Sequence, residues 1–180
     1  MVGGDASSPS SMAALARRTD IRFHTDGDAE PRVLVDGMDA TDAIRTETAG
    51  AAASAIAAIP EVRQALFDKQ HAFRQLPGLV ADGRDMGTIV FPDAQWKVFL
   101  TASASQRAER RYKQLKDKGV SANLDSLLHE IAARDERDAG RAVAPLKPAD
   151  DAVILDSTGM PITEVIDRVL AVLPASLRPS

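Results

Sequence analysis

The sequence predicts an α/β protein in which a parallel sheet is flanked by helices and accompanied by a small antiparallel element. Two short apolar runs, residues 97–101 and 152–155, are each followed by polar residues, and helical patterns separate them along the chain. Short apolar strands that alternate with helices are typical of a parallel sheet whose two faces are covered. A further apolar run, 79–81, ends at Asp82 and is predicted to add a strand to the same sheet.

Composition and charge restrict the classes of function. The chain has 180 residues, of which 44% are apolar and 27% are charged, as is ordinary for a globular protein. Its formal net charge of −4 argues against duplex nucleic acid as a partner, because proteins that bind duplexes usually carry a basic excess. No apolar run reaches the ~18 residues that indicate a membrane span, no signal peptide is visible, and no cysteine is present. We therefore expect a cytoplasmic protein that binds neither nucleic acid nor membranes.

The first residues are predicted to form a leader followed by a hairpin. Residues 1–11 are mostly Gly, Ser and Pro, a composition that predicts a disordered leader. Residues 12–19 are compatible with the end of a helix. Two short runs of roughly alternating polarity, 20–24 and 32–36, flank a segment that contains the turn sequence Thr-Asp-Gly-Asp. This pattern predicts an antiparallel hairpin.

Three helices are predicted from composition and periodicity. The Ala-rich stretch 47–59 favours a helix, and Pro60 ends it and can begin the next, where its missing N–H does no harm. From 61 to 76 the apolar residues share one face and polar residues another, as expected of an amphipathic helix. The last helix is predicted over 162–173, because its apolar residues recur at spacings of three and four.

Two helices that carry many arginines are predicted between the last two strands. Ser105 is expected to cap the first, and Asn123 or Asp125 the second. The charged side chains that share a face are Arg107, Arg110 and Arg111 on the first helix and Arg134, Arg137, Asp138 and Arg141 on the second. One interpretation is a lid that closes over a polyphosphate and supplies cations to the transferring group. The alternative is a solvated face whose arginines pair with Asp135 and Glu130 of their own helix.

The segment 82–88, Asp-Gly-Arg-Asp-Met-Gly-Thr, concentrates groups that can bind ligands. Asp82 is predicted to lie at the end of a parallel strand, the edge at which α/β sheets bind their ligands. Gly83 and Gly87 would let the backbone approach a ligand closely, Arg84 suits a phosphate, and the acids suit a metal or a base. Taken alone, the segment is equally compatible with a turn held by internal salt bridges.

The phosphate-binding loop of many nucleotide kinases is not found in these 180 residues. That loop reads Gly-x-x-x-x-Gly-Lys-[Ser/Thr] after a strand, and none of the 11 glycines has this spacing or is followed by lysine. His24, His71 and His129 form no metal-ligand pattern with one another. We expect these histidines to be ordinary surface or hydrogen-bonded residues.

Three long segments, 44–66, 77–94 and 134–158, closely resemble bacterial cytidylate kinases of the nucleoside monophosphate kinase family. The resemblance runs continuously from residue 20 to the last predicted helix. It implies an enzyme that transfers a phosphoryl group from ATP, with Mg²⁺, to CMP or dCMP, giving ADP and CDP or dCDP. It also implies a monomer, and it likens the predicted hairpin to an antiparallel insert in the monophosphate-binding region of these enzymes.

The resemblance implies roles for individual side chains. Family positions that contact the exocyclic amine of cytosine match Ser54 and Asp85, and the position that contacts N3 and O2 matches Arg63. A carboxylate at this amine is chemically reasonable, since the same pairing reads cytosine in nucleic acids. The other implied roles are phosphate contact for Arg84 and Arg141, ribose contact for Arg134 and Asp138, orientation of the Mg²⁺ shell for Asp82, and membership of the lid for Arg107, Arg110 and Arg111. The expected catalytic set is Asp82, Arg84, Arg134 and Arg141.

The resemblance also suggests a division of the chain. Its expected parts are a leader at 1–11, a monophosphate-binding region at 12–76, a core at 77–104 and 149–180, and a lid at 105–148. A UMP/CMP or adenylate kinase is the alternative within this class, and both Asp85 and the predicted hairpin argue against it.

Family members begin with a strand, a Gly-rich loop with its lysine, and a helix that have no counterpart in these residues. We therefore expect an N-terminally truncated cytidylate kinase with an incomplete P-loop-kinase-like sheet and with weak or no phosphoryl transfer. Two alternatives stay open: a non-catalytic fragment that binds CMP, and a pseudogene product that does not fold.

Overall fold

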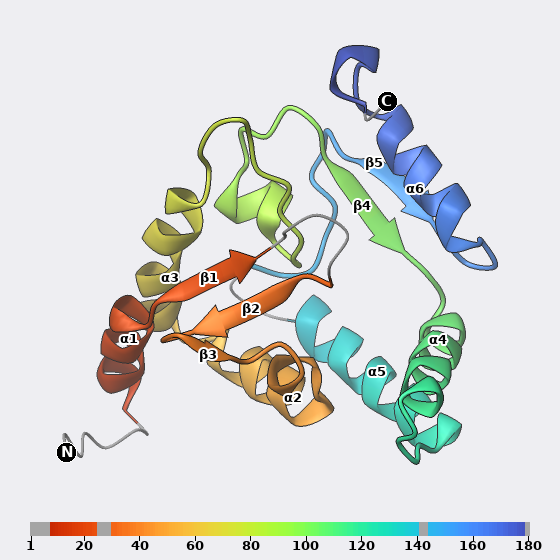
Figure 1. Ribbon diagram of the computed structural model, residues 1–180, viewed down its shortest axis with the longest axis horizontal. Helices are drawn as coiled ribbons and strands as arrows, with labels where there is room; N and C mark the ends of the chain where they lie inside the picture. Colours follow the sequence, from red (N-terminus) through yellow and green to blue (C-terminus); the bar gives the residue numbers. More distant parts are fainter. Residues whose placement is uncertain (1–7, 25–29, 141–143, 179–180) are drawn as a thin grey trace. The chain divides into compact units, whose positions relative to one another are not determined.

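The computed structural model describes residues 8–24, 30–140 and 144–178 (Figure 1). The chain divides into two compact units, residues 1–80 and 81–180. The elements of the first unit are α1 (Pro9–Arg18), β1 (Ile21–His24), β2 (Arg32–Val35), β3 (Met38–Asp39), η1 (Ala43–Arg45), α2 (Glu47–Ile56) and α3 (Pro60–Ala72). Those of the second unit are η2 (Met86–Val90), β4 (Val98–Thr101), α4 (Ala104–Asp117), α5 (Leu124–Ala139), β5 (Val153–Asp156), α6 (Ile162–Ala171) and η3 (Ala175–Leu177). The protein is a mixed α/β structure.

The first unit contains a three-stranded antiparallel sheet in the order β1-β2-β3. The predicted hairpin is confirmed, because Ile21 pairs with Val35 and His24 with Arg32. The third strand, β3, is not predicted in the sequence analysis. It follows a two-residue turn in which Asp36 has φ 49° and Gly37 has φ 80°, the positive values that match the twist of paired strands. The dipeptide Asp-Gly between apolar residues is the sequence signal that could have revealed it.

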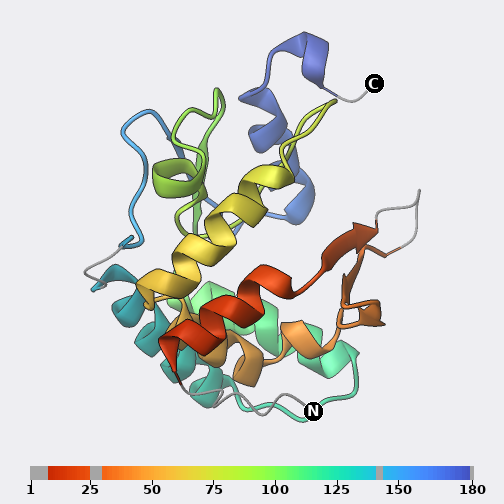
Figure 2. The same cartoon turned by 90° about the vertical axis from the view of Figure 1, so that its left-hand side faces the viewer.

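Helices α1 and α3 lie side by side in the first unit (Figure 2). Their contact buries Ala13 of α1 against Val62 and Ala65 of α3, the core cluster of this unit. Helix α1 begins at Pro9 because the side chain of Ser8 accepts a hydrogen bond from Ser11 N at 3.2 Å and proline suits the first helical position. The expectation of a disordered leader is therefore wrong for residues 9–11, and residues 1–7 lie outside the described part of the chain.

Helices α2 and α3 confirm the two predicted helices but end earlier. Helix α2 begins after Thr46, whose side chain accepts a hydrogen bond from Ala49 N at 3.2 Å, and it ends at Ile56. Helix α3 has Pro60 at its first position, as predicted, and ends at Ala72 rather than at residue 76.

The second unit contains the predicted parallel strand pair. Strands β4 and β5 run parallel, with Val98 opposite Val153 and Thr101 opposite Asp156. The predicted strand at 79–81 is wrong: among the described residues none pairs with this segment, and Val80 is 99% exposed. An apolar run forms a strand only when its backbone groups pair with a neighbour, and the local sequence does not specify that neighbour.

Helices α4 and α5 pack against each other in the second unit. Helix α4 begins at Ala104, and its cap is Ser103, whose Oγ accepts from Gln106 N at 3.2 Å. The predicted cap at Ser105 is therefore wrong, whereas the predicted cap of α5 at Asn123 is confirmed. Helix α6 confirms the predicted last helix, but it ends at Ala171 and not at residue 173. Within the described ranges, none of the helices combines the length and hydropathy that a membrane span requires.

Candidate functional site

The segment 82–88 leads into a π-helical turn. Asp82 is exposed, and Arg84 and Asp85 are half-buried. The carbonyl of Asp85 accepts hydrogen bonds from Ile89 N at 2.9 Å and from Val90 N at 3.2 Å, so the turn η2 starts directly after this acid. π-Helical turns are rare and often occur at functional sites. The backbone therefore gives Asp85 a distinctive local setting.

The two glycines of this segment lie close to protein side chains. A Cβ on Gly83 would lie 2.9 Å from Met86 Cγ, and one on Gly87 would lie 3.3 Å from Lys97 Cδ. This crowding gives both glycines a packing reason. This packing reason holds whether or not a ligand binds at the segment.

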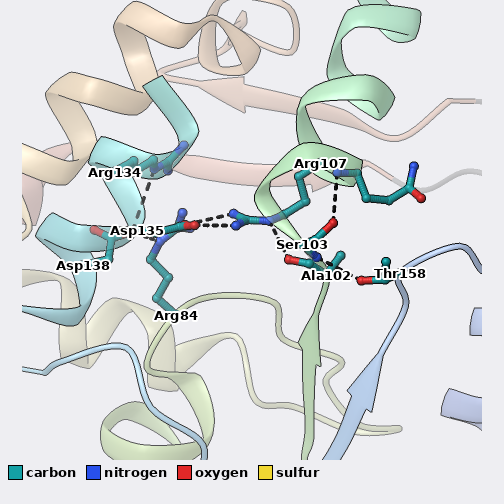
Figure 3. A network of polar contacts seen from close by, with 9 residues as sticks. Arg84, Ala102, Ser103, Arg107, Arg134, Asp135, Asp138 and Thr158 are labelled. Atoms are coloured by element: carbon teal, nitrogen blue, oxygen red, sulfur yellow. Dashed lines mark hydrogen bonds and ion pairs between the residues drawn. The ribbon is translucent and has the colours of Figure 1, made fainter. Parts of the chain in front are cut away.

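A buried carboxylate joins two of the predicted site arginines (Figure 3). Asp138 on α5 has no exposed side-chain surface, and its Oδ2 accepts a hydrogen bond from Arg84 Nε. Arg134 Nε lies 3.9 Å from the same oxygen. A buried charge is costly unless it is paired and hydrogen-bonded, so this cluster satisfies Asp138. The structure thus brings together Arg84, Arg134 and Asp138, which the sequence analysis assigned to phosphate and ribose.

A second ion pair links α4 to α5 (Figure 3). Arg107 Nη1 donates to Asp135 Oδ1 at 2.9 Å, and Nη2 donates to Asp135 Oδ2. Arg107 Nε also donates to the carbonyl of Ala102 at 3.1 Å. The hydrogen bonds with Asp135 raise the pKa of Arg107 above its ordinary value. The alternative in which Asp135 pairs within its own helix does not hold, because its partner comes from α4.

Arg110 donates hydrogen bonds to Ser157, which directly follows β5. Its Nη1 donates to Ser157 Oγ at 3.1 Å and its Nη2 to the Ser157 carbonyl at 2.6 Å. Ser157 Oγ in turn donates to the Thr101 carbonyl at 3.0 Å, so this buried serine connects β4, β5 and α4. Ser157 is not among the site residues predicted from the sequence. The polar run that follows the strand was its available signal.

A further set of hydrogen bonds fixes the start of α4 beside the end of β5. Ser103 N donates to Thr158 Oγ1 at 3.0 Å (Figure 3). Thr158 N donates to Asp156 Oδ1 at 2.9 Å, and the hydrogen bonds from Thr158 lower the pKa of Asp156. These contacts hold the cap residue Ser103, directly before α4, beside the end of β5.

The structure does not show whether the remaining predicted site residues lie close to one another. Ser54 on α2 and Arg63 on α3 are half-buried and belong to the first unit, whereas Asp85 belongs to the second. Arg63 Nη1 donates to the Ala57 carbonyl at 3.4 Å. The shared cytosine contact therefore stays a prediction, and so does the lid role of Arg111, which is half-buried on α4. Arg141 lies outside the described residues.

The donor set for a metal ion is sparse. Among the residues that the structure describes, no group of three or more His, Cys, Asp or Glu could hold a metal. Mg²⁺ in phosphoryl-transfer sites is usually bound through one or two carboxylates together with substrate phosphates and waters. The single exposed carboxylate of Asp82 fits contact with the water shell of such an ion.

Comparison with known proteins identifies the family. The sequence profile described as cytidylate kinase matches residues 3–175. The cytidylate kinase of Azotobacter vinelandii is 55% identical over 174 residues, which span 96% of this chain and 76% of that relative. The resemblance stated from the sequence is thus confirmed. The chain belongs to the cytidylate kinase family of nucleoside monophosphate kinases, which are phosphotransferases.

Proposed function

We propose that this chain carries the acceptor side of a cytidylate kinase, which binds CMP or dCMP as the acceptor of a phosphoryl group from ATP. The supporting observation is the convergence of Arg84 and Arg134 on the buried carboxylate of Asp138. Of the three side chains that the resemblance assigns to phosphate and ribose, Arg134 and Asp138 are neighbours on α5, and Arg84 joins them from a segment 54 residues away from Asp138. A cluster of two cations and one acid suits a ligand that presents both a phosphate and hydroxyl groups.

The proposed role of Arg84 follows from how its donors are arranged. A guanidinium has five N–H donors in a rigid fork, and Arg84 commits its Nε to Asp138. Asp138 thereby orients the guanidinium of Arg84. The two terminal nitrogens of Arg84 can then donate to a phosphate. Arginine forms bidentate bonds with phosphate, so this orientation favours the monophosphate of CMP.

The proposed base selectivity rests on complementary donors and acceptors. The exocyclic amine of cytosine donates, and the carboxylate of Asp85 accepts. N3 and O2 of cytosine accept, and the guanidinium of Arg63 donates. Uracil reverses the polarity at N3 and at the exocyclic position, so Asp85 would lose its partner and Arg63 would lose N3 while it keeps O2. An unsatisfied buried polar group costs on the order of 1–3 kcal/mol, which favours CMP over UMP.

The donor side of the reaction requires groups that these residues do not supply. Mg²⁺, when bound, neutralises charge on the phosphates, and Asp82 would contact its water shell. The 180 residues contain no Gly-x-x-x-x-Gly-Lys-[Ser/Thr] loop, whose backbone N–H groups and lysine cradle the donor phosphates. We therefore propose that these residues alone bind CMP but show weak or no turnover with ATP. A non-catalytic CMP-binding role is the second candidate, which this same observation favours.

Calorimetry and a coupled assay test the proposal. The purified 180-residue protein is titrated with CMP, UMP and ATP, and release of ADP is measured in the presence of Mg²⁺ and CMP. We expect heat with CMP, less with UMP and none with ATP, together with little release of ADP. A folded protein that gives no heat with CMP would overturn the proposal, and a flat melting curve would favour the unfolded alternative. Turnover near that of the Azotobacter enzyme would show that the loop is not required.

The proposal includes a monomer, as the resemblance implies, and a location in the cytoplasm, as the composition suggests. Size-exclusion chromatography with light scattering tests the first point, and a fluorescent fusion in a bacterial cell tests the second.

A further inference from the structure

The guanidinium of Arg107, on α4, binds both α5 and the end of β4. Its fork holds both carboxylate oxygens of Asp135 on α5, and its Nε donates to the carbonyl of Ala102, just after β4. Arg107 itself lies in the first turn of α4 (Figure 3). A bidentate arginine–carboxylate pair fixes orientation as well as distance. Arg107 therefore sets where α5 lies relative to the end of the sheet.

The partner of Arg107 is next to the nucleotide cluster in the sequence. Asp135 directly follows Arg134 and precedes Asp138 by less than one turn of α5. A shift or rotation of α5 would move all three residues together. It would therefore change the contact of Asp138 with Arg84, which comes from a separate segment of the chain.

We propose that Arg107 is a positioning residue, which acts through Asp135 to place Arg134 and Asp138 for the nucleoside monophosphate. This inference rests on the proposed function, because it takes the cluster of Arg84, Arg134 and Asp138 to be the CMP site. It differs from the expectation that Arg107 is a lid cation that touches a phosphate. Both oxygens of Asp135 are held by Arg107, so a phosphate would have to displace a bidentate carboxylate to reach the same nitrogens.

The two roles predict opposite effects of removing the acid. If Arg107 contacted the phosphate, Asp135→Asn would remove a nearby negative charge and free the guanidinium, so CMP would bind as tightly as before or more tightly. If Arg107 acts by positioning, Asp135→Asn breaks the same link as Arg107→Met and weakens CMP binding to a similar extent. The sign of the Asp135→Asn effect therefore separates the two roles.

The first test is a double-mutant cycle on CMP affinity, measured by calorimetry with the full 180-residue protein. We expect Arg107→Met and Asp135→Asn each to raise the Kd for CMP about tenfold, and the double variant to raise it about tenfold as well, because coupled residues are not additive. Weaker binding by Arg107→Met together with unchanged or tighter binding by Asp135→Asn overturns the inference. A multiplicative effect in the double variant also overturns it.

The matched control is Arg168→Met on α6. Arg168 forms an exposed pair with Glu164 at 2.7 Å, away from the proposed cluster in the sequence. Arg168→Met removes the same charge from an ion pair of similar length and should leave the Kd for CMP unchanged. A general effect of net charge would appear in this variant too and would count against positioning.

The second test does not need CMP. Hydrogen–deuterium exchange of peptides from α5 is compared between the wild type and the two variants. We expect faster exchange in the last turns of α5 in Arg107→Met and in Asp135→Asn, and no change in Arg168→Met. Unchanged exchange in α5 overturns the inference even if CMP binds. An absence of CMP binding by the folded wild type overturns the proposed function instead, and exchange then decides whether Arg107 holds α5.

Discussion

Arg84 and Asp138 form an ion pair across 54 positions of sequence, and the carboxylate in this pair has no exposed side-chain surface. Arg134 Nε lies 3.9 Å from Asp138 Oδ2. Arg84 thus gives this buried carboxylate a direct hydrogen bond from a cation. The pair links the segment 82–88 to α5. Arg84 and Asp138 therefore have a structural role in addition to their proposed contacts with the ligand.

Loss of Arg84 should destabilise the fold because it leaves a buried charge behind. We expect Arg84→Met to lower the free energy of unfolding by about 3 kcal/mol, a typical cost of removing one partner from a buried pair. The measurement is urea unfolding followed by circular dichroism at pH 7. The double variant Arg84→Met/Asp138→Asn should be more stable than Arg84→Met, since it no longer buries a carboxylate that has lost its hydrogen bond from Arg84. A double variant that is less stable than the single one would contradict this account.

The local elements could be predicted from the sequence because their determinants are local. The hairpin of β1 and β2 and the parallel strands β4 and β5 follow from alternation, apolar runs and turn residues. The N-terminus of α3 follows from Pro60, and that of α5 follows from Asn123. In each case the residues that decide the structure lie within a few positions of the element.

The predictions that were wrong concern features that depend on residues distant in the sequence. Whether 79–81 is a strand depends on a neighbouring strand, and Ser103, the cap in place of Ser105, is hydrogen-bonded to Thr158, which is 55 residues away. Likewise Asp135 has a partner on α4, 28 residues away, and not on its own helix. The site arginines could be recognised by type and by resemblance, but which acid each one binds is decided by tertiary packing.

Ser157 should contribute to stability through its two roles at the ends of β4 and β5. Its Oγ donates to Thr101 O and accepts from Arg110. Ser157→Ala removes both bonds and leaves a carbonyl and a guanidinium partly unsatisfied, so we expect a loss of about 1–2 kcal/mol. Thermal melting measures it. Thr158→Val is the comparison, because it removes a hydroxyl that is exposed, although this hydroxyl accepts a bond from Ser103 N and also bonds to Asp156, and it should cost less than Ser157→Ala.

The pair of Lys97 and Asp151 should make stability depend on pH in the acid range. Lys97 Nζ lies 2.9 and 2.7 Å from the two carboxylate oxygens of Asp151 and 2.7 Å from the Pro92 carbonyl, and the lysine side chain is only 8% exposed. The hydrogen bond from Lys97 lowers the pKa of Asp151 in the folded state. A carboxyl whose pKa is lowered by folding stabilises the protein fully above its unfolded pKa of about 3.9, and this contribution is lost as pH falls through the folded pKa.

Asp151→Asn tests this dependence. At pH 7 the variant should melt below the wild type, and at pH 3 the difference between the two melting temperatures should shrink, because Asp151 is then increasingly protonated in both states. Asp150→Asn, which neutralises the adjacent exposed acid, should show no such change with pH. A difference between wild type and Asp151→Asn that is as large at pH 3 as at pH 7 would show that the charge of Asp151 is not the cause.

Asp85 should decide the preference for cytosine over uracil under the proposed function. Asn keeps the size of the side chain, but its amide can turn its donor toward the carbonyl of uracil, whereas a carboxylate can only accept. We expect Asp85→Asn to raise the Kd for CMP about tenfold, as for the loss of one charge-assisted hydrogen bond, and to reduce the ratio of UMP to CMP Kd values. Calorimetry with both nucleotides measures this ratio. Asp167→Asn on α6, which removes the same charge from an exposed position, should leave it unchanged, and a ratio that Asp85→Asn does not alter would place the recognition of the amine elsewhere.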